Sequence, residues 1–243
     1  MASPQSRRAP ARPEPAELFE RLGAHITPGT LELALTHRSF AYEHGGLPTN
    51  ERLEFLGDSV LGYVVTDHLY AAYPDLPEGD LARRRAAVVS TRALARVARR
   101  VGVGEHVRLG TGETRTGGAD KDSILADTFE ALIGAVYVDH GATAAAALVH
   151  RHVVPLLTEP ALLRESTDWK TVVAEAAARH GAGPVVYEIE AQGPAHEPRF
   201  RATLTVGGRA YGSAVAGSKK QAERDAAAEG WPALEEALAG PGA

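Results

Sequence analysis

Four carboxylates at helical spacing are the residues of this sequence best suited to chemistry. Glu54 and Asp58 lie four residues apart, and Asp127 and Glu130 lie three apart, so each pair shares one face of a helix. Carboxylate oxygens are hard ligands, and four of them converging from two helices suit Mg²⁺ or Mn²⁺. Two such ions about 4 Å apart are a general solution for phosphodiester hydrolysis. The spacing therefore predicts a metal-dependent hydrolytic site.

The helices that carry these acids are apolar and contain no base. Neither segment 53–66 nor segment 123–138 includes a Lys or an Arg. A helix that is apolar nearly all round is expected to be buried, and a buried carboxylate without a compensating charge is costly. Something positive must therefore come from outside the two helices. One acidic pair alone would more often be an ordinary helix turn, but two pairs in such surroundings favour a metal site.

The elements that must position the acids are predicted to be helical. Apolar residues recur at helical spacing over residues 15–157, interrupted by segments rich in Gly and Pro. Asn50 is the predicted N-cap of the first acidic helix, which puts Glu51 on the same face as Glu54. Residues 1–14, rich in Pro, Ala and Arg, are predicted to be a disordered tail, and residues 158–166 a linker.

After the linker the pattern changes to that of a small α+β domain over residues 167–237. We expect a helix at 168–180, strands at 185–191, 199–206 and 209–215, and a helix at 218–229. Gly207 and Gly208 predict a tight hairpin between the last two strands. The order is α-β-β-β-α. The segment Gly230-Trp231-Pro232 predicts that the last helix ends early or kinks there.

Composition excludes several classes of protein. With no Cys, the chain can form no disulfide and no thiolate metal site. No secretory signal is evident, and no apolar run reaches the roughly 18 residues of a membrane span, so we expect a cytoplasmic protein without a membrane partner. A net charge of −5 argues weakly against nucleic acid.

Two motifs connect the sequence to a known family. The segment from Asn50 to Ser59 (NERLEFLGDS) resembles the signature motif of bacterial ribonuclease III, and the segment from Asp127 to Ala131 (DTFEA) resembles its second acidic motif. Shorter matches at 36–39 and 77–79 belong to the same resemblance, which extends over nearly everything after residue 15.

The resemblance implies a mainly α catalytic domain of the ribonuclease III type that cuts double-stranded RNA, processing rRNA and mRNA precursors. It implies a homodimer that leaves 5'-phosphate and 3'-hydroxyl ends with short 3' overhangs. The metal ligands would be Glu54, Asp127 and Glu130, and Asp58 and Glu130 would be catalytic, with Asp58 ordering metal-bound water. Two further acids match positions that flank the cluster in the family, although a capping or loop role is about equally expected for them: Glu51 and Glu78.

The α-β-β-β-α segment resembles a double-stranded RNA-binding domain, through matches at 170–171, 193–197 and 218–223. Such a domain reads the shape of A-form RNA across two minor grooves and the phosphates between them. Lys219 and Lys220 open a helix, where positive charge favours phosphate binding. The RNA-binding candidates are Thr171, Glu175, His196, Lys219 and Lys220. Ala174 and Ala178 replace the Gln side chains that the family normally offers, so fewer minor-groove contacts are expected.

Alternatives remain at this stage. A non-catalytic scaffold that binds double-stranded RNA could share the fold, but such relatives are expected to lose cluster carboxylates. A small-molecule phosphohydrolase would leave the second domain unexplained. His37 could be a general base, although a structural role is favoured. The arginines of segment 83–100 are expected mostly to face solvent, and the loop 110–118 could approach a phosphate backbone but has no nucleotide-binding motif.

Overall fold

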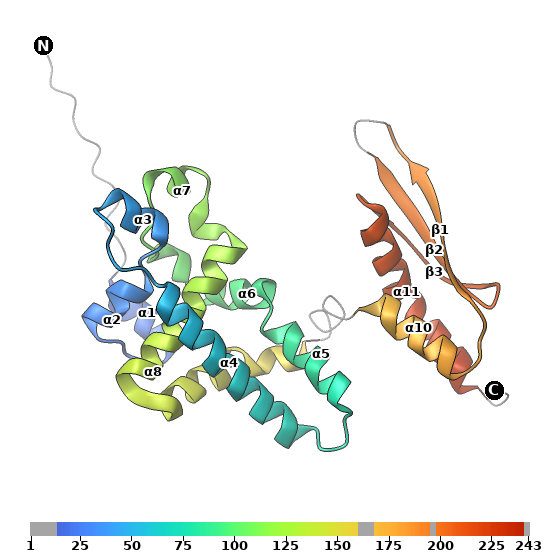
Figure 1. Ribbon diagram of the computed structural model, residues 1–243, viewed down its shortest axis with the longest axis horizontal. Coiled ribbons are helices and arrows are strands. Elements are labelled where there is room, and N and C mark those ends of the chain that lie inside the picture. Colours follow the sequence, from blue (N-terminus) through green and yellow to red (C-terminus); the bar gives the residue numbers. More distant parts are fainter. Residues whose placement is uncertain (1–13, 160–167, 195–197, 241–243) are drawn as a thin grey trace, which may run out of the picture. The chain divides into compact units, whose positions relative to one another are not determined.

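The computed structural model describes residues 14–159, 168–194 and 198–240 (Figure 1). The described residues fall into two compact units, one within residues 1–165 and the other within residues 166–243. Nearly all of the predicted tail and linker lies outside the described residues.

The first unit is built from helices, as predicted. Its α-helices are α1 (Pro15–Leu22), α2 (Pro28–Ala34), α3 (Arg38–Glu43), α4 (Glu51–Ala72), α5 (Glu78–Val88), α6 (Thr91–Val101), α7 (Thr111–Arg115) and α8 (Asp122–His152). Short 3-10 turns are η1 (Val103–Glu105), η2 (Gly118–Asp120) and η3 (Val154–Thr158). Within α8, Gly141 has a positive φ of 80° that interrupts the helix after the acidic segment.

Helix α8 runs through the core of this unit. Its side chains Phe129, Leu132 and Ile133 are fully buried. The stretch Asp122–Thr158 is long and apolar enough to cross a membrane by length and composition alone. An 18-residue window within it has a mean hydropathy of 1.4, and 44% of that window is buried. The expectation that no apolar run reaches such a length was therefore wrong. In this fold the stretch packs as a core helix against α4 and α6.

Helices α4 and α8 approach each other so closely that their backbones touch. A Cβ atom on Gly57 would lie 1.8 Å from the carbonyl oxygen of Glu130, and one on Gly134 would lie 2.2 Å from that of Leu53. Only glycine fits at both positions. The contact brings the acidic turn of each helix against the other, which the sequence pattern alone did not reveal.

The expectation that α4 is buried all round was wrong for one face. Leu61, Val65 and Leu69 are buried, but Phe55, Tyr63 and Tyr70 are exposed at 77%, 69% and 76%. Within a single chain, no described element covers that face. A large apolar face of this kind marks an interaction surface.

The second unit consists of α10 (Trp169–Arg179), β1 (Val185–Gln192), β2 (Arg199–Val206), β3 (Arg209–Ala216) and α11 (Lys219–Ala239). The antiparallel sheet has the order β1-β2-β3. Both glycines of the β2–β3 turn have positive φ, 58° at Gly207 and 83° at Gly208, as the predicted tight hairpin requires. Ala202, Leu204 and Val206 face the helices and are buried. The predicted α-β-β-β-α order is confirmed.

Of the two outcomes predicted at Gly230-Trp231-Pro232, an early end or a kink, the early end is wrong. The last helix continues through Pro232 to Ala239. Proline inside a helix costs about 3 kcal/mol, but Leu234 beyond it is fully buried, and the ring of Trp231 lies 6.1 Å from that of Trp169. Packing on the core of the unit therefore maintains the helix across the proline.

Candidate metal centre

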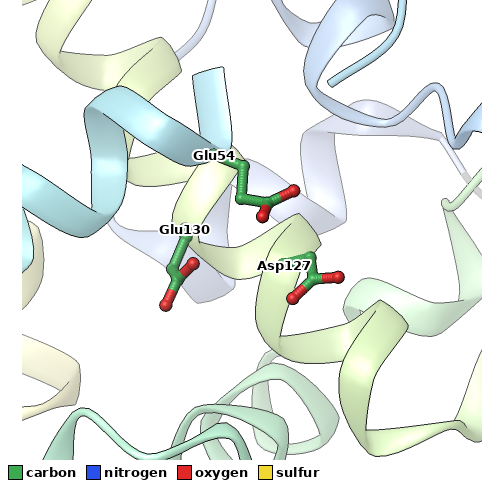
Figure 2. A group of neighbouring side chains, drawn as sticks. All are labelled: Glu54, Asp127 and Glu130. Carbon is green, nitrogen blue, oxygen red and sulfur yellow. The ribbon is translucent and has the colours of Figure 1, made fainter. Parts of the chain in front are cut away.

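Three carboxylates from two helices converge at one point in the first unit (Figure 2). Glu54 comes from α4, and Asp127 and Glu130 come from α8. One oxygen atom of each lies within 4.8 Å of the others, and all three residues are partly buried. An all-oxygen donor set of this kind fits a hard divalent cation such as Mg²⁺.

Burial and mutual repulsion make these acids hold protons unusually tightly. The pKa of Glu130 is raised to about 8, first by burial and then by the charges of Asp58, Asp127 and Glu54. Burial also raises the pKa of Glu54, with help from the charge of Asp127, and burial raises the pKa of Asp127. Acids placed so that they resist ionisation gain most from a bound cation. The shifts therefore support the fit of the cluster to a metal.

Asp58 lies one turn beyond Glu54 on α4 and is exposed. It does not belong to the group of three, yet its charge raises the pKa of both Glu54 and Glu130. The four predicted acids thus interact, with three close enough to share a cation and the fourth at their edge.

The positive charge that the sequence required from outside the two helices comes from Arg38, the first residue of α3. Its charge lowers the pKa of both Glu54 and Asp127, against the effect of their burial. Its Nη1 atom lies 4.0 Å from Oε1 of Glu51, and its side chain is 76% exposed. Sequence reasoning did not single out Arg38. The sequence did offer a signal for it, because Arg38 is a basic residue directly after His37 in the segment 36–39 that resembles the family.

The flanking acids take two different places. The hydroxyl of Thr49 donates a 2.9 Å hydrogen bond to Glu51, and Asn50 at the N-cap position makes no side-chain capping bond. Glu78, at the start of α5, lines a separate pocket of about 220 Å³ with Thr66 and Arg85. Within one chain, Glu78 is therefore not part of the cluster.

A cavity of about 720 Å³ adjoins the cluster. One wall comes from α3 and the start of α4, with His37, Arg38 and Asn50, and the other from α7 and the start of α8. Glu54 and Asp127 also line it. The cavity therefore connects the acids to a wall that carries hydrogen-bond donors.

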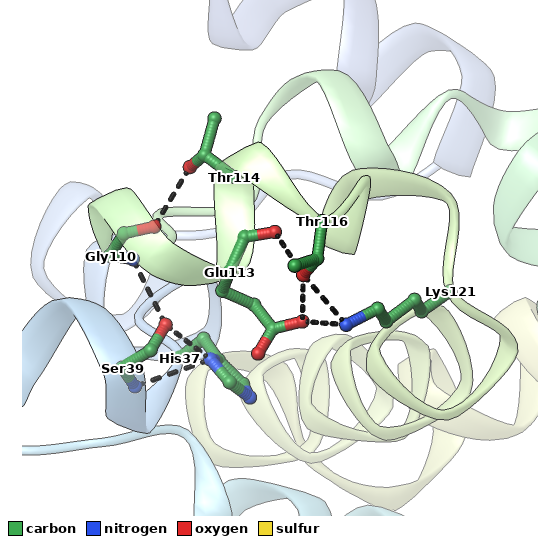
Figure 3. A network of polar contacts seen from close by, with 7 residues as sticks. All are labelled: His37, Ser39, Gly110, Glu113, Thr114, Thr116 and Lys121. Atoms are coloured by element: carbon green, nitrogen blue, oxygen red, sulfur yellow. Dashed lines mark hydrogen bonds and ion pairs between the residues drawn. The ribbon is translucent and has the colours of Figure 1, made fainter.

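His37 has a structural role at this wall (Figure 3). Its Nδ1 atom accepts a 3.2 Å bond from the backbone N–H of Ser39 and lies 2.8 Å from the Ser39 hydroxyl. The same hydroxyl accepts a bond from the N–H of Gly110. Burial lowers the pKa of His37. Since Nδ1 accepts, the neutral ring carries its proton on Nε2 and cannot take up another there as a base.

The loop 110–118 is held by side chains of its own unit. Both carboxylate oxygens of Glu43 accept from the N–H of Thr111, at 2.8 and 2.9 Å. Lys121 binds Glu113 and donates a 2.9 Å bond to Thr116 (Figure 3). The backbone donor that would meet a phosphate at the start of α7 is therefore occupied by Glu43, which weakens the expectation that this loop contacts RNA.

The arginine-rich stretch from Arg83 to Arg100 is also tied to its own unit. Three of its arginines form ion pairs: Arg83 with Asp80, Arg96 with Glu159, and Arg99 with Asp120 and Asp122. Two donate hydrogen bonds, Arg85 to the hydroxyl of Thr66 and Arg100 to the carbonyl of His152. The guanidinium of Arg84 lies over the ring of Tyr73. Most of these arginines are exposed, as expected, and several of them also join neighbouring elements through these contacts.

The RNA-binding candidates of the second unit lie on exposed surfaces. Thr171 and Glu175 are exposed on α10, although the Thr171 hydroxyl donates to Asp168, the N-cap of the helix. Lys219 and Lys220 are exposed at the start of α11, where Ser218 caps the helix by accepting from Gln221. His196 lies outside the described residues.

Both units match known families. Residues 28–157 match a model described as ribonuclease-III-like, and residues 169–234 match the double-stranded RNA binding motif. The chain is 57% identical to the "Ribonuclease 3" of Thermobifida fusca over 91% of this chain and 92% of that protein. It is 53% identical to the "Ribonuclease 3" of Streptomyces coelicolor over 95% of this chain and 84% of that protein.

A solved structure resembles the first unit. It is the nuclease domain of ribonuclease III from Campylobacter jejuni, described with structural flexibility in a region involved in dimer formation. The match has a TM-score of 0.55 and 35% sequence identity, and it covers 58% of this chain and 96% of that domain.

Proposed function

The chain belongs to the ribonuclease III family of double-strand-specific endoribonucleases, and on this basis we propose that Glu54, Asp127 and Glu130 hold the Mg²⁺ with which it cuts RNA. The observation that carries the proposal is the convergence of three partly buried carboxylates with raised pKa values on one point. Mn²⁺ has the same preference for oxygen ligands and could substitute.

When bound, the metal supplies an activated water and stabilises charge on the leaving 3'-oxygen. The chain's own residues position these groups. Glu54 and the pair Asp127 and Glu130 hold the cation from opposite helices. Asp58, exposed at the edge of the cluster, would order water bound at the site. The products are 5'-phosphate and 3'-hydroxyl ends.

The enzyme is a homodimer, so that two such sites act on the two strands of one duplex. The exposed apolar face of α4, with Phe55 and Tyr63, fits a dimer contact. Next to it, residues of α4 and α8 that include Tyr63 and Tyr137 line a pocket of about 560 Å³. The two cuts would leave short 3' overhangs. We place the enzyme in the cytoplasm, where it would process rRNA and mRNA precursors.

Double-stranded RNA is also held by the second unit. Lys219 and Lys220 at the start of α11 favour phosphate, because their charge adds to the positive end of the helix dipole. On α10, Ala174 and Ala178 are exposed beside Thr171 and Glu175. Methyl groups donate no hydrogen bonds, so we propose few minor-groove contacts and a weak sequence preference.

The decisive experiment compares labelled RNA duplex with matched single strand in Mg²⁺, in Ca²⁺ and in chelator. We expect cleavage of duplex only in Mg²⁺ or a similar ion, and binding without cleavage in Ca²⁺. Equal cleavage of single strands would contradict the strand specificity.

Glu130→Gln removes a proposed metal ligand while keeping the size of the side chain. We expect cleavage to fall by at least about 10³-fold, with binding of duplex in Ca²⁺ nearly unchanged. Glu20→Gln, the same substitution at an exposed position of α1, should leave cleavage near that of the unchanged enzyme. Retained turnover in Glu130→Gln would favour the alternative that this carboxylate is not catalytic.

A further inference from the structure

The cavity beside the acidic cluster is larger than a metal site needs. Its volume of about 720 Å³ falls within the roughly 300–1,000 Å³ of pockets that take a small ligand. Its lining includes Arg38, His37 and Asn50 on the α3 side and the acids Glu54 and Asp127 of the cluster. Three further acids line it, each engaged within the unit: Glu43 with Thr111, Glu51 with Thr49, and Glu113 with Lys121. A molecule that fills it would therefore touch the metal-binding acids and the donor wall together.

Arg38 is the cation of that wall with the weakest attachment to the protein. Its nearest ion-pair partner, Glu51, is 4.0 Å away at the limit of contact, and its side chain is 76% exposed. Lys121, which lines the opposite wall, is by contrast bound to Glu113 and Thr116. Arg38 can therefore bind an anion without first giving up a close partner.

His37 adds a neutral donor to the same wall. Its Nε2–H is fixed by the contacts that Nδ1 makes with Ser39. Asn50 also lines the cavity, is 3% exposed and makes no side-chain capping bond to α4. The wall therefore offers a cation and a neutral donor, which suits the phosphates of a sugar–phosphate backbone.

The guanidinium of Arg38 also suits a phosphate by its shape. The fork of donors on an Arg side chain matches two phosphate oxygens.

We propose that this cavity binds the sugar–phosphate backbone of the cut strand directly beside the scissile phosphate, with Arg38 as the ligand of one neighbouring phosphate. The inference rests on the proposed function of the acidic cluster and adds a substrate-binding subsite to it. Arg38 does not act on the scissile bond; it fixes where the strand lies.

The test combines protein and substrate changes in the full-length enzyme. A duplex with mapped cut positions carries a neutral methylphosphonate in place of each phosphate flanking one scissile bond, one at a time. For the unchanged enzyme we expect single-turnover cleavage to fall about tenfold at one flanking position, as expected for losing one charged contact. Arg38→Gln should cut the unmodified duplex about tenfold more slowly and show no further loss at that position.

Arg115→Gln is the matched control, because Arg115 is exposed on α7 and does not line the cavity. It removes the same charge and should keep the sensitivity of the unchanged enzyme at that position. Arg38→Lys, which keeps a positive charge, should keep part of the sensitivity to the methylphosphonate at that position. Thermal unfolding of each variant shows whether it is folded.

If Arg38→Gln is folded and remains as sensitive as the unchanged enzyme at every position, the subsite is wrong. The same holds if no flanking methylphosphonate slows the unchanged enzyme. Failure of the underlying function would look different, since the unchanged enzyme would then not cut the unmodified duplex in Mg²⁺ at all.

Discussion

Burial and neighbouring charge both raise the pKa of Glu130. Its pKa of about 8 lies well above its ordinary 4.5, first because it is buried and then because Asp58, Asp127 and Glu54 surround it. Without metal, the folded protein keeps a proton that the unfolded chain loses. This contribution to stability is present below about pH 4.5 and is lost as the pH rises through about 8.

The stabilisation of the protein by Mg²⁺ should therefore grow with pH. Metal competes with the proton on Glu130, so the rise in Tm on adding Mg²⁺ should be larger at about pH 9 than at about pH 6. Differential scanning fluorimetry measures it. In Glu130→Gln the side chain at position 130 carries no proton for the metal to displace, so the rise in Tm on adding Mg²⁺ should depend less on pH. An equal Mg²⁺ effect at both pH values in the unchanged enzyme would contradict this account.

At the scale of elements, the glycine contact between α4 and α8 decides where the acids lie. Gly57 packs on the backbone of Glu130 itself, so the position of that carboxylate depends on a missing side chain one helix away. Arg38 on α3 then adds a positive charge that lowers the pKa of Glu54 and of Asp127. The site is therefore built by the crossing of helices rather than by any one of them.

Gly57→Ala should destabilise the protein by about 1–3 kcal/mol, because the added methyl group overlaps the Glu130 carbonyl and must push the helices apart. Cleavage should fall with it. Gly62→Ala is the matched control on the same helix, where an added Cβ meets nothing within 4 Å and alanine favours the helix by up to about 1 kcal/mol. Urea unfolding compares the two, and equal effects would remove the close crossing as the cause.

The start of α11 should account for part of the salt dependence of RNA binding. Replacing both Lys219 and Lys220 with Gln should weaken binding of duplex in Ca²⁺ and reduce the slope of log K against log salt by about 2. Lys170→Gln is the control, because Lys170 is engaged with Glu223 inside the unit and should change stability more than the slope. An unchanged slope in the double variant would exclude both lysines as phosphate contacts.

For the whole molecule, we propose that the second copy of the chain covers the uncovered face of α4. Phe55 is 77% exposed in one chain, although exposing a large aromatic side chain forgoes about 1.5–3 kcal/mol of burial. It lies directly after Glu54, so the proposed dimer surface and the proposed metal site share one helix.

Phe55→Asp should shift the protein from dimer to monomer, because it places a charge in an apolar contact. Sedimentation velocity over a range of concentrations measures the shift. Val186→Asp, which puts the same charge on an exposed aliphatic position of β1, should leave the dimer intact. A dimer of unchanged strength in Phe55→Asp would place the contact on another face.

The sequence by itself determined the acids, the two-domain order of elements and the hairpin at Gly207 and Gly208. These follow from local spacing and from residue types whose conformational preferences act within a few positions. It also required a positive charge from outside the acidic helices, without identifying it.

Only the tertiary structure decided which residues meet. It selected Arg38 as the external charge, separated Glu78 from the cluster within the chain, and left one face of α4 uncovered. It also carried α11 through Pro232, because Trp231 and Leu234 gain more by packing than the helix loses at the proline. Contacts of this kind depend on how distant elements cross, and the hydrophobic periodicity of each element does not specify its neighbour.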